Sequence, residues 1–142
     1  AAGGGGAIAN ILSRTAVQPS RGLALSSMVR AGLAAWTKML ADEVGPQGVR
    51  VLGVLPGLTR TPHIEEGLRA RGTEPGAGAI GAVPDAALEA SAQAAARTEG
   101  VPLGRLGTPE ALGRLVAFLV SPACDYVTGS LVRFDGGAIR AL

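Results

Sequence analysis

Residues 49–61, VRVLGVLPGLTRT, join a short apolar run to a tight turn and decide the fold class. The apolar run at 49–55 is short and bounded by turn residues, which is typical of a buried strand. Pro56-Gly57 then ends the strand as a turn. In parallel α/β sheets, ligands bind in the turns outside the carboxyl ends of the strands. This turn is therefore a candidate binding site.

The residues before this strand predict another strand followed by a long helix. Residues 7–12, AIANIL, form a second short apolar run and predict a buried strand, and residues 13–22 are polar and turn-like. Between 25 and 44 the spacing predicts a helix that ends at Gly45-Pro46. Its apolar stripe, expected at the core or at an interface, comprises Val29, Leu33, Trp36, Leu40 and Val44.

The residues after this strand predict two weak helices, a strong helix and a final strand. We expect helices at 61–71 and 85–98, separated by a flexible glycine-rich stretch at 72–83. Thr108 and Pro109 form a helix start signal, and the helix that follows ends at Ser121-Pro122. Its apolar face comprises Leu112, Leu115, Val116 and Leu119. Residues 130–134 predict the third strand.

Strands that alternate with helices indicate an α/β protein with a parallel sheet covered on both faces. We therefore predict a parallel sheet of three strands joined by crossover helices, although three strands make a poor doubly wound sheet. Because crossovers are right-handed, helices are expected on both faces only where the strand order reverses. The glycines at 3–6 precede a strand rather than follow one, so they do not form a dinucleotide fingerprint and are expected to be a mobile tail.

Composition excludes several classes of protein. The chain has 142 residues, a net charge of +2, one cysteine (Cys124) and one histidine (His63). A single cysteine forms no internal disulfide, and one Cys with one His builds no zinc site, so no metal is expected. No apolar run is long enough for a membrane span. The arginines are scattered singly, which argues against a nucleic-acid partner.

Five segments together resemble the C-terminal half of a short-chain dehydrogenase/reductase, most closely the ketoacyl-reductase-like members. They are the strand ending at Ser13, the helix after Ser26, VLPGLTRT at 54–61, GRLGTPE at 104–110, and VTG at 127–129 with FDGG at 134–137. The resemblance implies a Rossmann-like, doubly wound parallel sheet, of which residues 1–142 are the C-terminal half and begin at the family's fifth strand. It also implies a catalytic strand–helix–strand at 1–61, a substrate-loop insert at 62–107, and the last helix and strand at 108–142.

The family uses a serine, a tyrosine and a lysine for catalysis, and two of these residues are replaced here. Ser13 matches the catalytic serine, but Ser26 stands at the tyrosine position and Arg30 at the lysine position. The single tyrosine, Tyr126, matches a structural family residue, and the single lysine, Lys38, is expected on the solvent side of its helix.

These replacements weaken the expected general acid/base chemistry. A serine hydroxyl is far less acidic than a tyrosine, whereas arginine keeps its proton throughout the neutral range. Arg30 could bind the nicotinamide ribose and stabilise a developing oxyanion. Three interpretations stay open: the ordinary ketone/alcohol reaction, an altered chemistry or binding role for Ser26 and Arg30, and no role beyond the helix itself.

The resemblance also implies NAD or NADP as cofactor, held on its nicotinamide side by Arg30 and by Pro56, Gly57, Leu58, Thr59 and Thr61. The insert is either a lid over the substrate or an ordinary surface excursion. His63 is expected at the surface of the insert and Cys124 in the packing.

The expected partners are a small-molecule substrate, the missing N-terminal half of the fold, and further copies in a homo-dimer or homo-tetramer. We expect a cytoplasmic location and an unstable chain when alone, because a hydrophobic sheet edge lies where the fourth strand belongs. The alternatives are a catalytically degenerate subunit that binds a nucleotide, a ligand or a partner, and a fragment without an independent role.

Overall fold

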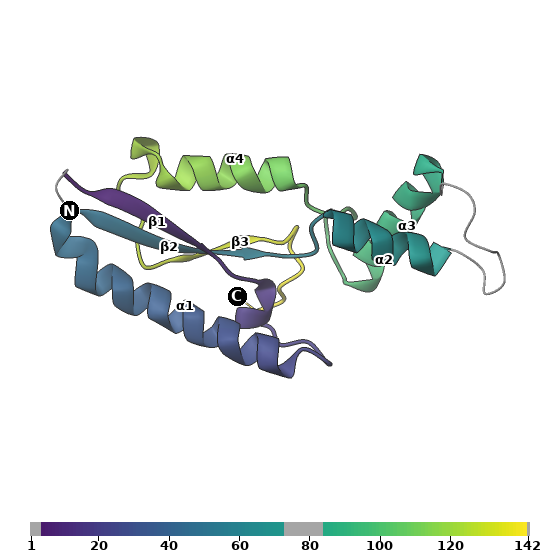
Figure 1. Ribbon diagram of the computed structural model, residues 1–142, viewed down its shortest axis with the longest axis horizontal. Coiled ribbons are helices and arrows are strands. Elements are labelled where there is room, and N and C mark those ends of the chain that lie inside the picture. Colours follow the sequence, from purple (N-terminus) through teal and green to yellow (C-terminus); the bar gives the residue numbers. More distant parts are fainter. Residues whose placement is uncertain (1–3, 73–83, 142) are drawn as a thin grey trace.

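The computed structural model describes residues 4–72 and 84–141, and contains every helix and strand predicted from the sequence (Figure 1). The glycine-rich stretch lies almost wholly at 73–83, outside the described residues. Short 3₁₀ turns η1, η2 and η3 follow β1, α1 and α4. The main elements are β1 (Gly6–Ile11), α1 (Ala24–Val44), β2 (Val49–Pro56), α2 (Pro62–Gly72), α3 (Asp85–Thr98), α4 (Pro109–Val120) and β3 (Leu131–Phe134).

The three strands form one parallel sheet in the order β1-β2-β3, as the alternation of strands and helices predicts. Ile11 pairs with Val54, and Pro56 pairs with Phe134, so the carboxyl ends of all three strands lie at the same end of the sheet. Helices α2 and α3 extend beyond that end (Figure 1). The turns that could bind a ligand therefore lie between the sheet and this helical pair.

Helices α1 and α4 cover opposite faces of the sheet (Figure 1). Leu52 and Val54 of β2 pack toward α4, whereas Leu55 packs on the face that carries α1. The strand order advances in one direction without reversing, so the two crossovers have opposite hands. The expectation that two covered faces require a reversal was wrong here. The long connection through α2 and α3 gives the chain enough length to reach the other face.

Helix α1 contacts the sheet through small side chains rather than through its predicted apolar stripe. Ser27, Thr37 and Ala41 are its buried residues, while Trp36 of the stripe is 46% exposed. The sheet offers Gly53 at this contact, where an added Cβ would lie 2.5 Å from Leu131 Cδ2. Small residues on both sides allow a close approach of helix and sheet, which leaves the larger apolar residues outside. The core position considered for Trp36 was therefore wrong.

Helix α4 packs as its sequence predicts. Its predicted apolar face lies against Leu52 and Val54 of β2, together with the buried Cys124, whose expected packing role is confirmed. Thr108 caps the helix by accepting a hydrogen bond from the Ala111 N–H at 3.2 Å. At the other end, Arg50 donates to the carbonyl oxygens of Leu119 and Ser121, which satisfies terminal groups that a helix leaves unpaired.

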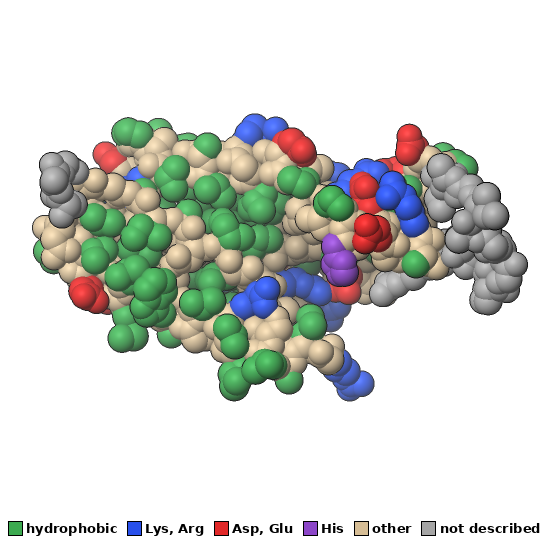
Figure 2. Space-filling model, in the orientation of Figure 1, with side chains coloured by type: hydrophobic (Ala, Val, Ile, Leu, Met, Phe, Trp, Pro, Cys, Tyr) green, Lys and Arg blue, Asp and Glu red, His purple; other side chains and the backbone are tan. Residues whose placement is uncertain are grey.

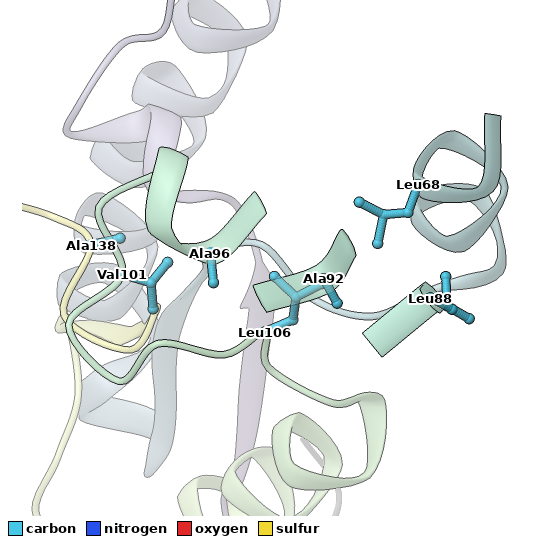
Figure 3. Packing of buried hydrophobic residues seen from close by; sticks show 7 residues of the cluster. All are labelled: Leu68, Leu88, Ala92, Ala96, Val101, Leu106 and Ala138. Carbon is cyan, nitrogen blue, oxygen red and sulfur yellow. The ribbon is translucent and has the colours of Figure 1, made fainter. Parts of the chain in front are cut away.

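A second core lies under the α2–α3 pair (Figure 3). Leu68 of α2 lies near Leu88 and Ala92 of α3, and further along α3 the cluster continues to Val101 and Ala138. The last two residues belong to the segment after α3 and to the chain beyond β3. The insert is therefore packed onto the main body by its own apolar residues.

Of the two described glycines before β1, Gly5 is closely packed and so is not part of a mobile tail, whereas nothing lies within 4 Å of an added Cβ on Gly4. An added Cβ at Gly5 would lie 2.5 Å from the carbonyl oxygen of Gly48, and the Gly6 N–H donates to that same oxygen. Residues 1–3 lie outside the described part of the chain. The close approach of two backbones explains why glycine stands at this position.

An apolar surface begins at β1, which forms one edge of the sheet. Among the described residues no strand pairs with the outer side of β1, and Ile8 and Ile11 on it are 39% and 52% exposed. Figure 2 shows apolar side chains gathered across the sheet and α1 in this view. The exposed apolar residues of α1 are Leu25, Met28, Val29, Leu33, Trp36 and Met39. In the described ranges, no helix has both the length and the hydropathy to cross a bilayer.

Candidate active site

Ser13 lies directly after β1, at the carboxyl end of the sheet. The strand ends where the Leu12 N–H donates to the Val54 carbonyl at 2.8 Å, and Ser13 then caps the turn η1 (Arg14–Ala16). Its Oγ accepts a hydrogen bond from the Thr15 N–H at 3.3 Å. The turn η1 contacts both α1 and β2. Ser13 is therefore held by backbone geometry and not by a flexible loop.

Ser26 and Arg30 form a hydrogen-bonded pair in the first turns of α1. The Arg30 guanidinium donates to Ser26 Oγ, and both residues are partly buried. Residues four apart in a helix share one face, so the pair depends only on the regular helix. The guanidinium occupies an acceptor lone pair of the hydroxyl, which leaves the hydroxyl proton free to donate to another group.

The turn after β2 packs directly against the segment after β3. The Gly57 N–H donates to the Phe134 carbonyl at 2.9 Å, and an added Cβ on Gly57 would lie 2.8 Å from Asp135 Cα. Asp135 in turn accepts hydrogen bonds from the N–H groups of Gly137 and Ile139. Sequence reasoning used Asp135 only as part of a motif and missed this role, in which its carboxylate holds the chain end beside the turn.

The same turn is paired on its other side with the segment that precedes α4. The Arg60 N–H donates to the Gly107 carbonyl at 2.8 Å, and the Gly107 N–H donates to the Leu58 carbonyl at 3.0 Å. Thr59 Oγ1 donates to the Gly57 carbonyl at 3.2 Å. Two separate segments thus fix the conformation of residues 57–60, and the turn is rigid for that reason.

The polar groups of this turn fit the carboxamide side of a nicotinamide. Within the described residues, the backbone N–H groups of Leu58 and Thr59 donate to no other residue. Thr61 directly precedes α2 and caps it: its Oγ1 accepts from the Ile64 N–H at 3.4 Å, and its carbonyl accepts from the Glu65 N–H. A ligand with an amide oxygen would find two free backbone donors here, on the consecutive residues Leu58 and Thr59.

Two arginines tie the α2–α3 pair to the candidate site. The Arg60 guanidinium binds Glu65 of α2 at 2.7 Å and Glu89 of α3 at 2.9 Å, and both carboxylates raise the pKa of Arg60 above its ordinary value. Arg14, the residue after Ser13, pairs with Glu99 just beyond α3. Sequence reasoning missed both contacts, because pairs 29 and 85 positions apart carry no local signal.

A groove of about 750 Å³ lies between α2 and α3. Leu58 of the turn contributes to its wall, so the groove opens beside the candidate cofactor contact. His63 lines it and is exposed, as expected for a surface residue of the insert. A second groove, of about 660 Å³, is lined by Val49, Arg50 and Tyr126 near the amino ends of the strands. This groove therefore lies at the end of the sheet opposite to Ser13.

The structure joins some of the predicted site residues and separates others. Ser26 and Arg30 touch, but Ser13 forms no side-chain hydrogen bond with either of them in the described part of the chain. Tyr126 is 99% exposed and lines the second groove, so the described part of the chain does not bury it and its expected structural role stays a prediction. Lys38 faces solvent, as predicted, and pairs with Asp42. Residues 4–72 and 84–141 contain no cluster of potential metal ligands.

A family model and a curated relative both match almost the whole chain. A family model described as Enoyl-(Acyl carrier protein) reductase matches residues 1–138. The chain is 33% identical over 134 residues to the short-chain reductase protein NovJ of Streptomyces niveus, which covers 94% of this chain and 45% of that protein. The chain thus spans about half the length of the curated relatives it matches.

Two solved structures are also similar to this chain over almost its whole length. The NADPH-bound structure of a short-chain oxidoreductase from Pseudomonas aeruginosa PAO1 containing an atypical catalytic centre is 32% identical, with a TM-score of 0.81 over 96% of this chain and 47% of that one. L-sorbose reductase from Gluconobacter frateurii, in complex with NADPH and L-sorbose, is 30% identical, with a TM-score of 0.85 over 98% and 49%.

Proposed function

This chain belongs to the short-chain dehydrogenase/reductase family, and we propose that it supplies the catalytic and substrate-binding part of an NAD(P)-dependent oxidoreductase with an atypical site. The substrate would be a carbonyl compound or the corresponding alcohol. The observation that carries this proposal is the hydrogen bond from Arg30 to Ser26 Oγ. It places a permanent cation on a hydroxyl at the helix start where the family has its tyrosine and lysine.

The nicotinamide would supply or accept the hydride at the substrate carbon, and this chain would manage the charge on the substrate oxygen. Leu58 and Thr59 would hold the carboxamide through their N–H groups beside Thr61, and Arg30 would bind the nicotinamide ribose. During reduction, the Ser13 and Ser26 hydroxyls donate hydrogen bonds to the oxygen as it becomes negative. Arg30 polarises Ser26 and stabilises that charge without losing its own proton.

The proton that completes the alcohol must come from water, because neither a serine hydroxyl nor a guanidinium is acidic enough near neutral pH. The loss of a positioned general acid typically costs about 10²–10⁴-fold in rate. We therefore expect slow but measurable turnover. The Pseudomonas aeruginosa relative, which contains an atypical catalytic centre, supports this interpretation.

The chain would act together with a complementary half, by which we mean a polypeptide that supplies the part of the relatives' length not spanned here. The open edge of β1 and the exposed Ile8 and Ile11 support this partner. We call the combination the completed protein. The apolar surface of α1 further supports a homo-dimer or homo-tetramer. A cytoplasmic location and the division into residues 1–61, 62–107 and 108–142 stay predictions.

The decisive experiment measures oxidation of NADPH or NADH by the completed protein across a panel of aldehydes and ketones. The double variant Ser26→Tyr/Arg30→Lys restores the family's residues. If Ser26 and Arg30 carry a chemistry of their own, this variant loses activity. A sharp rise in activity would instead indicate a degraded ordinary site.

A second candidate function is a catalytically degenerate subunit that binds the nucleotide or another ligand without turnover. One observation favours it: none of Ser13, Ser26 and Arg30 is a good general acid near neutral pH. Cofactor binding, measured by fluorescence in the same preparation, separates the two functions. Binding without turnover on any substrate would support the degenerate subunit.

A further inference from the structure

The groove between α2 and α3 is connected to the candidate site at two points. Leu58 lies both in its wall and in the turn after β2. Glu99 lies at its rim and pairs with Arg14, which directly follows Ser13. If the chain acts as proposed, a substrate whose oxygen lies near Ser13 would extend its remaining part into this groove.

The lining of the groove is apolar with a small number of polar groups, as in most sites for small molecules. Its apolar members include Leu58, Ile64, Leu68, Ala94 and Ala95, and its hydroxyls are Ser91 and Thr98. At about 750 Å³ its size falls within the usual range for small-molecule pockets. Shape and polarity therefore suit a hydrocarbon ring or chain with a few hydroxyl groups.

The formal charges in the described lining of the groove have one sign when His63, which also lines it, is counted as neutral. Its described lining includes the carboxylates of Glu66 and Glu99 and no lysine or arginine. Glu99 is neutralised by Arg14, whereas no ion pair with another described residue involves Glu66. Proteins bind carboxylates and phosphates through arginine, lysine or free backbone donors at a helix start. The first turn of α2 instead carries Glu65, and Ile64 already donates to Thr61.

We infer that the groove accepts an uncharged or cationic apolar group and discriminates against carboxylates and phosphates. This inference rests on the proposed function, because it describes the non-reacting part of the same substrate. A substrate attached to a phosphate-bearing carrier would have to keep the phosphate outside the groove. The class of substrate is then a free alcohol or ketone whose hydrocarbon ring or chain is uncharged or carries a positive charge.

The test uses three probes of similar shape: cyclohexanol, cyclohexylamine and cyclohexanecarboxylate. Their dissociation constants are measured by ligand-detected NMR on the completed protein without cofactor, at low ionic strength. One unpaired carboxylate about 4 Å from the probe's charge in water changes the affinity about fivefold. We expect the carboxylate to bind about fivefold more weakly than the alcohol or worse, and the amine to bind at least as tightly as the alcohol.

Three variants test whether the probes bind in the groove. Ala94→Phe fills it and should abolish binding of all three probes, while Ala117→Phe, at an exposed alanine of α4 outside the groove, should leave binding unchanged. Glu66→Gln should reduce the discrimination against the carboxylate. Equal affinities for the alcohol and the carboxylate would overturn the inference, as would no saturable binding of any probe or unchanged binding in Ala94→Phe. NADPH binding is measured separately, so failure of the proposed function is distinguishable from failure of this inference.

Discussion

Arg60 binds Glu89 of α3 at 2.9 Å while its own backbone belongs to the turn that follows β2. The same guanidinium binds Glu65 of α2 at 2.7 Å. One side chain of the candidate cofactor turn is thus shared by both helices that form the groove. We conclude that Arg60 couples the position of the α2–α3 pair to the turn, and that it acts as a positioning residue.

Replacing Arg60 by alanine should loosen α2 and α3 without disturbing the sheet. The two helices lose their common ion-pair partner, although their apolar core with Leu68 and Leu88 remains. Hydrogen exchange, followed by mass spectrometry, should become faster in α2 and α3 and stay unchanged in β2. In the completed protein, KM for the substrate should rise more than kcat falls.

The control for this prediction is Arg114→Ala, at an exposed arginine of α4. Equal exchange rates in the Arg60 and Arg114 variants would contradict the coupling. The effect should not depend on pH from neutrality to strongly alkaline conditions. Since the pKa of Arg60 is raised, its contribution is complete below the ordinary arginine pKa and is lost only as the pH rises through the higher folded value.

Arg30→Met should lower kcat strongly, while Arg30→Lys should retain part of the activity. Methionine keeps much of the side-chain length but removes the positive charge that polarises Ser26. Loss of one donor that stabilises a developing oxyanion typically costs about 10²–10³-fold in kcat. Steady-state kinetics of the completed protein with its best carbonyl substrate provide the measurement. If Arg30→Met retained full activity, Arg30 would be no more than a helix surface residue.

Much of the fold could be predicted from the sequence because its signals are local. The helix start at Thr108-Pro109 and the apolar run of β2 depend on neighbouring residues, and both elements occur as predicted. The face of α1 could not be predicted in this way. Its orientation depends on how closely it approaches Gly53, and that approach involves residues of β1, β2 and β3.

In the candidate site, too, the local contact was predictable from the sequence and the long-range contacts were not. The pairing of Ser26 with Arg30 follows from helical spacing and was predictable as a shared face. The contacts of Arg14 with Glu99 and of Asp135 with the residues after it decide where Ser13 and the turn after β2 lie. The former joins residues 85 positions apart, so only the folded chain reveals it.

Two glycine-to-alanine variants should change stability in opposite directions. In Gly57→Ala the new Cβ would lie 2.8 Å from Asp135 Cα, and this backbone contact cannot be relieved by a rotamer change. Overpacking of this kind typically costs about 1–3 kcal/mol. Gly113 lies inside α4 with open space around it, so Gly113→Ala should stabilise by about 0.5–1 kcal/mol through helix propensity.

Urea denaturation of the completed protein measures both changes in the free energy of unfolding. An unchanged or higher stability of Gly57→Ala would mean that the turn after β2 and the segment at Asp135 can separate without cost. In that case the rigid turn that we assign to the nicotinamide contact would lose its structural basis.

The isolated chain of residues 1–142 should not unfold cooperatively as a monomer. The outer edge of β1 carries unpaired backbone groups together with the exposed Ile8 and Ile11, and such an edge pairs readily with other chains. Analytical ultracentrifugation should therefore detect self-association, and thermal unfolding should depend on protein concentration.

Ile8→Lys should reduce this self-association, because a charged side chain on an edge strand opposes pairing with another chain. Leu103→Lys is the matched control, since Leu103 is a 63% exposed apolar residue outside the sheet. Reduced association in both variants alike would indicate nonspecific hydrophobic contact instead of edge pairing. A monomer with a concentration-independent, cooperative transition would contradict the prediction and would mean that three strands with α1 and α4 suffice for a stable fold.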